Sequence, residues 1–207
     1  YPVTLVGTST GLDNGALWAT HYVVDDIACV KPFPNMHIYS PSSVESINQI
    51  FDEVIKLPHP SYVRITKKSF KENIQTEQIN HFVIKNENSK ILIISHGRMT
   101  GNAVEASKIS GKVSVFAMDK IKPLDIEFVR ILTKNYKKII ILEDNFNSGL
   151  FNSFAQIMIE LHINDVKAYS ISPKEDYGNN VGDTEYLDNQ FGLTPQKICE
   201  FIEKIEK

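Results

Sequence analysis

The chain has 207 residues, of which 42% are hydrophobic and 23% are charged, and its formal net charge is −3. This composition is typical of a globular protein with room for one or two domains, and it excludes the disordered and fibrous classes. The densest basic run, Lys67-Lys68 with Lys71, is too short for a basic face, so we expect no nucleic-acid partner. No apolar run reaches the roughly 20 residues of a membrane span, so we expect no membrane partner.

The cysteines and the start of the chain bear on its setting. Only Cys29 and Cys199 are present, far apart and without the spacing of zinc ligands, so the sequence indicates neither a disulfide framework nor a metal site. Pro2 to Val6 reads as a strand rather than as an export signal. We therefore expect a reducing, cytoplasmic setting and a chain that begins inside a fold at Tyr1.

The first elements follow from apolar periodicity and from breakers. We expect a strand from Val3 to Gly7 and then a polar, glycine-containing loop from Thr8 to Gly15. A helix is expected to start near His21 and to end before Pro32, which cannot continue it. The next strand is predicted from Met36 to Tyr39.

A second helix has a clear start signal. Ser42 and Glu45 have the spacing of a capping box, in which each side chain bonds an exposed backbone amide of the other residue. Apolar residues then recur along one side until Leu57-Pro58 ends the helix. A strand from Tyr62 to Thr66 completes a strand-helix-strand unit, which predicts parallel strands.

The rest of the chain alternates strands and helices after a polar, basic stretch with one apolar break at Phe82-Val83-Ile84. Strands are expected at Ile91–Ser95, Val113–Met118, Ile139–Leu142 and Ala168–Ile171, and helices at Asn102–Ile109, after Pro123, at Gly149–Leu161 and after Thr194-Pro195. Such alternation predicts a parallel sheet covered on both faces. The polar stretch from Asp176 to Asp188 is expected to be a surface loop.

His21 is the strongest single candidate for a functional side chain. It stands where the glycine-containing loop enters a predicted helix, with Asp25 and Asp26 one turn further on. An imidazole in that place can be presented to a ligand. From the residues alone, the alternative is a histidine whose ring bonds only to nearby backbone.

Several short motifs follow one another in a fixed order. They are Thr20-His21, Asp25-Asp26, Pro34-Asn35-Met36, Ser40-Pro41-Ser42, Tyr62-Val63-Arg64-Ile65, Lys122-Pro123-Leu124-Asp125 and Glu143-Asp144-Asn145 through Gly149-Leu150. This series resembles the end of the pyrimidine-binding domain and the C-terminal domain of the transketolase family. The resemblance covers essentially the whole chain. It implies an α/β fold of two domains with mostly parallel sheets covered by helices: residues 1–68, the back half of the pyrimidine-binding domain; 69–89, a linker; and 90–207, the C-terminal domain.

The same resemblance implies a function. Members of the family transfer a two-carbon ketol unit between sugar phosphates, and thiamine diphosphate with magnesium supplies the chemistry. His21 would be the catalytic residue in contact with substrate or cofactor, and Lys67 and Arg64 would help to bind the substrate. The active site would lie between the subunits of a homodimer or heterotetramer, with the C-terminal domain supporting the packing of the dimer.

The chain departs from the family's pattern at three positions. Leu17 stands where related enzymes carry an aspartate that bonds sugar hydroxyls, and leucine offers no acceptor. Ser9 replaces a further histidine of the family. Lys67 replaces an arginine and gives up the planar fork that grips phosphate. These changes leave the identity of the substrate open.

The cofactor-binding part of the family's pattern is missing. No Gly-Asp with a suitably spaced asparagine follows a strand, since Gly182-Asp183 has Asn189 far too close. The glutamate that activates thiamine in the family would lie upstream of Tyr1. We therefore expect this chain alone to bind no cofactor and to be inactive. An N-terminal transketolase section or an upstream domain would supply the missing half.

Alternative functions remain open. The β subunits of 2-oxo acid dehydrogenases and 1-deoxyxylulose-5-phosphate synthase share this two-domain ending and similar short motifs. A degenerate member that serves as a binding or assembly module without turnover would explain the replacements at Ser9, Leu17 and Lys67. Glu143-Asp144, at the end of a predicted strand, has the chemistry of a general base or a cation site. The family carries this acidic turn away from the cofactor, so we expect it to be structural.

Overall fold

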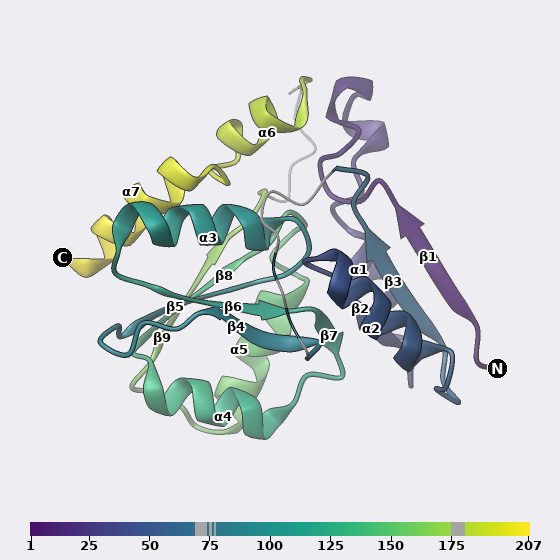
Figure 1. Cartoon of the computed structure of the whole chain (residues 1–207), viewed down its shortest axis with the longest axis horizontal. Helices are drawn as coiled ribbons and strands as arrows, with labels where there is room; N and C mark the ends of the chain where they lie inside the picture. Colours follow the sequence, from purple (N-terminus) through teal and green to yellow (C-terminus); the bar gives the residue numbers. More distant parts are fainter. Residues whose placement is uncertain (69–73, 75, 77, 175–180) are drawn as a thin grey trace.

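The computed structural model describes residues 1–68, 74, 76, 78–174 and 181–207, and these residues form two sheets (Figure 1). The first sheet has the strand order β1 (Thr4–Thr8), β3 (Ser61–Ile65), β2 (His37–Tyr39) and β7 (Lys120–Lys122). The second has the order β4 (Asn80–Ile84), β6 (Ser114–Met118), β5 (Ile91–Ser95), β8 (Lys138–Leu142) and β9 (Lys167–Ile171). No helix in these ranges is long and apolar enough to cross a membrane.

The two sheets are mostly parallel. Only β7 and β4 run antiparallel to their neighbours among the described strands. β4 lies inside residues 69–89, the expected linker, and β7 comes from the second half of the chain but joins the first sheet. β4 is held to β6 partly by Phe82, whose ring centroid lies 5.0 Å from that of Phe116. The predicted fold class is thus confirmed, while the domain boundaries stay a prediction.

Helices cover both faces of the second sheet. The helices are α1 (Asp26–Val30), α2 (Val44–Val54), α3 (Met99–Ser110), α4 (Ile126–Asn135), α5 (Leu150–Glu160), α6 (Thr184–Gln190) and α7 (Pro195–Glu206), and two 3-10 turns precede them, η1 (Gly15–Leu17) and η2 (Ala19–His21). In Figure 1, α3 and α7 lie on one side of the sheet and α4 and α5 on the other. Along β5, Ile93 packs in the core under α3 and α7, whereas Leu92 and Ile94 pack toward α4 and α5. Burial on both faces is why these strands read as continuous apolar runs.

The helix predicted between His21 and Pro32 exists, but its predicted start near His21 is wrong. His21 ends the turn η2, and α1 begins only at Asp26. The intervening Val23 cannot be helical because its backbone pairs with Gly11, with N–H···O distances of 2.9 and 3.0 Å. Apolar spacing indicated a helix here, but the pairing of Val23 with Gly11, twelve residues earlier, keeps this segment extended.

The capping box of α2 lies one residue later than predicted. Ser43, rather than Ser42, accepts a hydrogen bond from the backbone N–H of Ser46, and the Ser46 hydroxyl accepts one from the N–H of Ser43, both at 3.1 Å. Ser42 instead donates its hydroxyl to Asp119. Glu45 is therefore not the partner in the cap.

Removal of this cap has a measurable cost. We expect Ser43→Ala to lower the free energy of unfolding by about 1 kcal/mol, because an N-terminal amide of α2 loses its acceptor. Urea denaturation would measure the change. Ser153→Ala, inside α5, where the hydroxyl donates to the carbonyl of Gly149, should stay within about 0.5 kcal/mol. Equal effects of the two substitutions would contradict the assignment of the cap.

The surface loop predicted from Asp176 to Asp188 is wrong in its second half. Residues 176–180 lie outside the described residues, but α6 begins at Thr184. Its N-cap, Asp183, accepts a hydrogen bond from the N–H of Tyr186 at 2.8 Å, and Leu187 is fully buried in the core under α3 and α7. The polar composition of this stretch gave no sign of a short helix, in which Leu187 is the buried apolar side chain.

Candidate functional site

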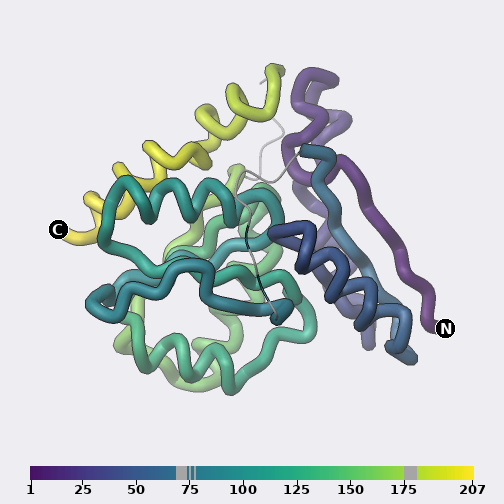
Figure 2. The backbone as a smooth tube through the Cα atoms, in the orientation of Figure 1, coloured from purple at the N-terminus to yellow at the C-terminus, as the bar shows by residue number. Residues whose placement is uncertain are grey.

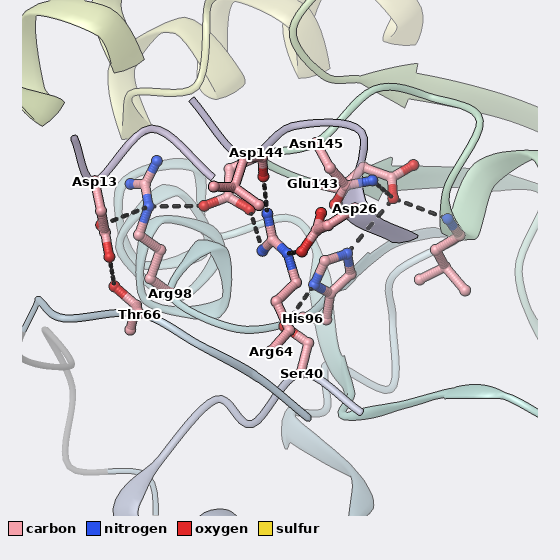
Figure 3. A network of polar contacts seen from close by, with 12 residues as sticks. Asp13, Asp26, Ser40, Arg64, Thr66, His96, Arg98, Glu143, Asp144 and Asn145 are labelled. Carbon is pink, nitrogen blue, oxygen red and sulfur yellow. Dashed lines mark hydrogen bonds and ion pairs between the residues drawn. The ribbon is translucent and has the colours of Figure 1, made fainter. Parts of the chain in front are cut away.

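A buried arginine joins the two sheets. Arg64, near the end of β3, has only 2% of its side chain exposed. Its Nε donates to Asp26 at 2.9 Å, its Nη1 to Asp144 at 2.7 Å and its Nη2 to the carbonyl of Val23 at 3.2 Å (Figure 3). Asp144 lies two residues after the end of β8 of the second sheet, so a single guanidinium group holds α1 and both sheets together.

A second buried arginine extends this network. Arg98, directly before α3, places its Nε 2.8 Å from Asp144 and 4.0 Å from Asp13, and its two terminal nitrogens donate to both oxygens of Asp188 at 2.8 Å. Asp188 lies in α6, so the network also fixes this short helix. Bidentate pairing of this kind is geometrically specific.

The two guanidinium groups set the charge of Asp144. Burial alone would raise the pKa of this carboxyl group, but the attraction of Arg64 and Arg98 outweighs burial and holds the pKa well below its usual range. In turn, the neighbouring carboxylates raise the pKa of both arginines against the effect of burial. Asp144, Arg64 and Arg98 are therefore ionised near neutral pH.

The loop before η1 holds Lys67. Asp13 accepts hydrogen bonds from the backbone N–H of Lys67 at 2.7 Å and from the hydroxyl of Thr66 at 2.8 Å. The Nζ of Lys67 donates to Oδ1 of Asn14. Asp13 and Asn14 thus determine where this ammonium group sits, just after β3.

A buried serine, histidine and glutamate form a further cluster where the two sheets meet. His96 places Nδ1 3.0 Å from Oγ of Ser40 and Nε2 3.5 Å from a carboxylate oxygen of Glu143. This order suggests nucleophilic catalysis, but Ser40 is only 1% exposed and the other two are fully buried. Glu143 also accepts the backbone N–H groups of Leu150 and Phe151 at 2.9 and 3.0 Å, so it caps α5. These contacts are those of structural residues, as expected for the acidic turn.

The exposed part of the site is carried by η1 and η2. His21 is exposed at the end of η2, with Nδ1 3.1 Å from the hydroxyl of Thr20. Leu17 and Trp18 are 54% and 61% exposed, and Trp18 has a φ of 75°. Backbone bonds from Leu17 to Asn14 and from His21 to Trp18 connect these residues in two consecutive turns.

The structure thus separates the three predicted site residues. Lys67 lies against Asn14 one turn before Trp18, and His21 ends the following turn; no hydrogen bond or ion pair between His21 and Lys67 occurs among the described residues. Arg64 faces inward and bonds three groups. Their catalytic and substrate-binding roles stay predictions.

Sequence reasoning missed the residues that support these three. Asp13 and Asn14 lie in a stretch whose composition predicts only a polar loop, and Arg98 and Asp188 are 90 positions apart. A weak signal existed for Arg98, since it follows the end of β5, where ligand sites of open α/β sheets lie. No local pattern could have paired it with Asp188.

At one edge of the first sheet, no further strand pairs with β1 within the part of the chain that the structure describes. β1 pairs only with β3 among the described strands, and Val3, Leu5 and Val6 are 46–53% exposed. Figure 2 shows this strand at the N-terminal side of the molecule, opposite the C-terminus. Since parallel sheets are normally covered on both faces, this partial exposure of Val3, Leu5 and Val6 is unusual.

Comparison with known proteins places this architecture. The family described as "Transketolase, C-terminal domain" matches residues 80–198. Over 217 residues the chain is 27% identical to an apulose-4-phosphate transketolase subunit of Phocaeicola vulgatus, covering 98% of this chain and 68% of the relative. The same-named subunit of Actinobacillus succinogenes is 30% identical over 166 residues, with 76% of this chain and 53% of the relative covered. The 1-deoxy-D-xylulose-5-phosphate synthase of Rhodopirellula baltica is 26% identical over 188 residues, covering 87% of this chain and 29% of its own length.

Solved structures agree in fold. A split-gene transketolase described as an inactive beta4 tetramer has a TM-score of 0.82 at 19% identity, with 98% of this chain and 65% of that chain covered. The transketolase of Campylobacter jejuni has a TM-score of 0.77 at 12% identity, covering 97% of this chain and 31% of its own. The chain thus spans between about a third and two thirds of the length of most of these proteins. Since the family match covers more than half of the chain, the protein belongs to the transketolase C-terminal domain family.

Proposed function

We propose that this chain is the C-terminal part or subunit of a thiamine-diphosphate-dependent transketolase-like enzyme that moves a two-carbon ketol unit between sugar phosphates. The observation that carries the proposal is the similarity over 98% of the chain to a protein named as a transketolase subunit. The exposed His21 and the ammonium group of Lys67, on neighbouring segments, are the groups that would meet a phosphorylated substrate.

The missing half would come from an N-terminal transketolase section or an upstream domain. The exposed edge and apolar side chains of β1 support this part of the proposal, since a partner strand or helix would bury them. A homodimer or a heterotetramer would then enclose the active site. The two free cysteines agree with a reducing, cytoplasmic setting.

We infer that the residues the structure describes do not hold the diphosphate and magnesium end of the cofactor. Among the described residues, no three His, Cys, Asp or Glu side chains are grouped to hold a metal ion. The carboxylates of Asp26, Asp144 and Asp188 are already paired with the guanidinium groups of the two buried arginines, Arg64 and Arg98. The partner would therefore supply the groups that hold the cofactor's diphosphate and its magnesium.

The cofactor is expected to bind only to the assembled enzyme. Thiamine diphosphate with Mg²⁺ should leave the melting temperature of this chain unchanged and should raise that of a complex with the N-terminal section, because a ligand stabilises only the native state that binds it. Differential scanning fluorimetry would measure both. Stabilisation of the chain alone would contradict the proposal that the partner supplies the groups that hold the cofactor.

The role of His21 can be tested in the same complex. We expect His21→Asn to lower kcat/KM for ketol transfer by about 10²-fold or more, as is typical for the loss of a group that moves a proton in the transition state. The matched control is His162→Asn, which replaces an exposed histidine that follows α5. Similar rates for the two variants would remove His21 from the catalytic residues.

Similarity to 1-deoxy-D-xylulose-5-phosphate synthases favours one alternative activity, the decarboxylative transfer of a two-carbon unit from pyruvate. Assays of the assembled complex with pyruvate and with ketose phosphates as donors would separate the two reactions. A complex that assembles but turns over neither donor would favour a binding or assembly module.

A further inference from the structure

The short helix α6 lies directly against the turn η1. The N–H of Gly182, just before α6, donates to the carbonyl of Gly15 at 3.4 Å. A β-carbon at Gly15 would lie only 2.1 Å from Cδ1 of Leu187, so a residue without a side chain is needed where α6 meets the turn. Figure 2 shows the start of α6 beside the purple N-terminal loop. The part of the chain that matches the C-terminal domain family therefore contacts the segment that leads to His21.

A series of polar contacts runs from α6 to the end of β3. Asp188 of α6 accepts hydrogen bonds from both terminal nitrogens of Arg98 at 2.8 Å. The Nε of Arg98 lies 4.0 Å from Oδ1 of Asp13. The other oxygen of Asp13, Oδ2, accepts the backbone N–H of Lys67 at 2.7 Å and the hydroxyl of Thr66 at 2.8 Å. The position of the Arg98 guanidinium group therefore affects the position of the backbone at Lys67.

Asp13 depends on Arg98 for the compensation of its charge. The side chain of Asp13 is fully buried, and its Oδ1 has no hydrogen-bond partner among the described residues. Burial of such an oxygen is costly unless an opposite charge is near. In the part of the chain that the structure describes, Arg98 is the one cation within ion-pair distance of Asp13. Since bidentate pairing is geometrically specific, Asp188 determines how this guanidinium group faces Asp13.

We propose that Asp188 is a positioning residue for the candidate site. Within the described residues it makes no hydrogen bond or ion pair with His21 or Lys67, so it acts through Arg98 and Asp13. Through them it holds the backbone of Lys67, and the packing of α6 on η1 holds the turns that end at His21. The inference rests on the proposed function for what these segments do in catalysis, but the positional role itself needs no substrate.

Hydrogen exchange of backbone amides in the full chain, followed by NMR, tests this role. The N–H of Lys67 is bonded to the carboxylate of Asp13, so its protection from exchange reports how firmly that carboxylate is held. We expect Asp188→Asn to lower the protection of this amide about tenfold, as for the weakening of one hydrogen bond to a charged group. Asp144 still pairs with Arg98 in the variant, so the fold is expected to persist.

A second amide and a second carboxylate serve as controls. The N–H of Phe128 also donates to an aspartate, Asp125 at the start of α4, and its protection should stay the same in every variant. Glu185→Gln removes an exposed carboxylate from the same helix, α6, and should leave the exchange of the Lys67 amide unchanged. Equal losses of protection at Lys67 and Phe128 would indicate general destabilisation and would contradict a positioning role.

Arg98→Lys tests the other half of the ion pair. Lysine keeps the positive charge but cannot pair bidentately with Asp188. We expect this variant to lower the protection of the Lys67 amide about as much as Asp188→Asn does. If the Lys67 amide stayed as protected as in the wild type in either variant, Asp188 would not position this backbone and the proposal would be wrong.

In the complex with the N-terminal section, Asp188→Asn should act mainly on KM. A displaced backbone at Lys67 weakens contact with the substrate, so we expect the KM for a ketose phosphate to rise about tenfold while kcat changes less than about twofold. General destabilisation would lower the amount of active enzyme and therefore the apparent kcat, and a lowered kcat with an unchanged KM would contradict the proposal. A complex without ketol transfer would count against the proposed function, and hydrogen exchange would still decide the role of Asp188.

Discussion

Replacement of Arg64 by methionine is expected to lower the free energy of unfolding by about 3–5 kcal/mol, the range for breaking a buried ion pair by removing one partner. Methionine keeps much of the volume but leaves the carboxylates of Asp26 and Asp144 without this guanidinium group. Both carboxylates are almost fully buried, so water cannot replace the lost bonds cheaply. Urea denaturation at pH 7 would measure the change.

The matched control is Arg130→Met. Arg130 lies on the exposed side of α4 and pairs with Glu127 one turn away, so its loss should cost well under about 1 kcal/mol. A similar small loss for Arg64→Met would mean that the buried network does not hold the sheets together.

The effect of Arg64→Met should also depend on pH. In the wild type the pKa of Asp144 is depressed, so its ionisation stabilises the fold above the ordinary carboxyl pKa of about 4, and this contribution is lost as the pH falls below that value. In the variant one of the two cations that depress this pKa is absent. The difference in unfolding free energy between wild type and variant should therefore shrink between pH 6 and pH 3. A difference that grew in that range would contradict the ion-pair assignment.

The sequence predicts the parallel strands of both sheets better than the two antiparallel strands, β4 and β7. Ile91–Ser95 and Ile139–Leu142 are buried on both faces, so each is visible as an unbroken apolar run. β7 is short and has lysine at two of its three positions, and it forms only because Lys120–Lys122 runs alongside β2, about eighty residues earlier in the chain. Pairing of that kind depends on the folded chain and leaves no local pattern.

The candidate site likewise contains residues that the sequence indicates and residues that only the tertiary structure reveals. His21 is visible in the sequence because its neighbourhood resembles a known motif, and it is exposed as a ligand contact must be. Arg64 has the right residue type for an anion site, but its side chain points inward because Asp26 and Asp144 meet it there. Only the tertiary structure decides between an arginine that binds a ligand and one that binds the protein itself. Asn14, which holds the exposed cation, carries no signal at all in the sequence.

Asp119 is the second residue with a large expected effect, and here the effect comes from pH. This carboxyl group directly follows β6, is fully buried and accepts a hydrogen bond from the hydroxyl of Ser42 at 3.1 Å. Its Oδ1 has no hydrogen-bond partner among the described residues. Burial raises the pKa of Asp119 to about 7, although hydrogen bonds from Ser42 and Ser46 partly oppose that rise. Its backbone carbonyl accepts the N–H of Ser40 at 2.7 Å, so the group sits where the two sheets meet.

The direction in which stability changes with pH follows from this raised pKa. The folded protein binds the proton of Asp119 more tightly than the unfolded chain does, so its stabilising contribution is complete below about pH 4 and is lost as the pH rises through about 7. A shift of about three pKa units corresponds to about 4 kcal/mol. Asp119→Asn has no proton to lose at this position. Between pH 4.5 and pH 8.5 its free energy of unfolding should therefore rise relative to the wild type by about 3–4 kcal/mol.

The two stability curves are expected to cross. At low pH the asparagine variant should be less stable, because its amide N–H group takes the place of an oxygen that has no partner, at a cost of about 1–3 kcal/mol. Above pH 7.5 it should be the more stable protein, because the wild type must then bury a charged carboxylate. Asp125→Asn, which exchanges one good N-cap of α4 for another, should run parallel to the wild type. If the stability curve of Asp119→Asn also ran parallel to that of the wild type, Asp119 would not titrate in this range. A crossing of the two curves would show that ionisation of Asp119 weakens the contact between the sheets as the pH rises above neutrality.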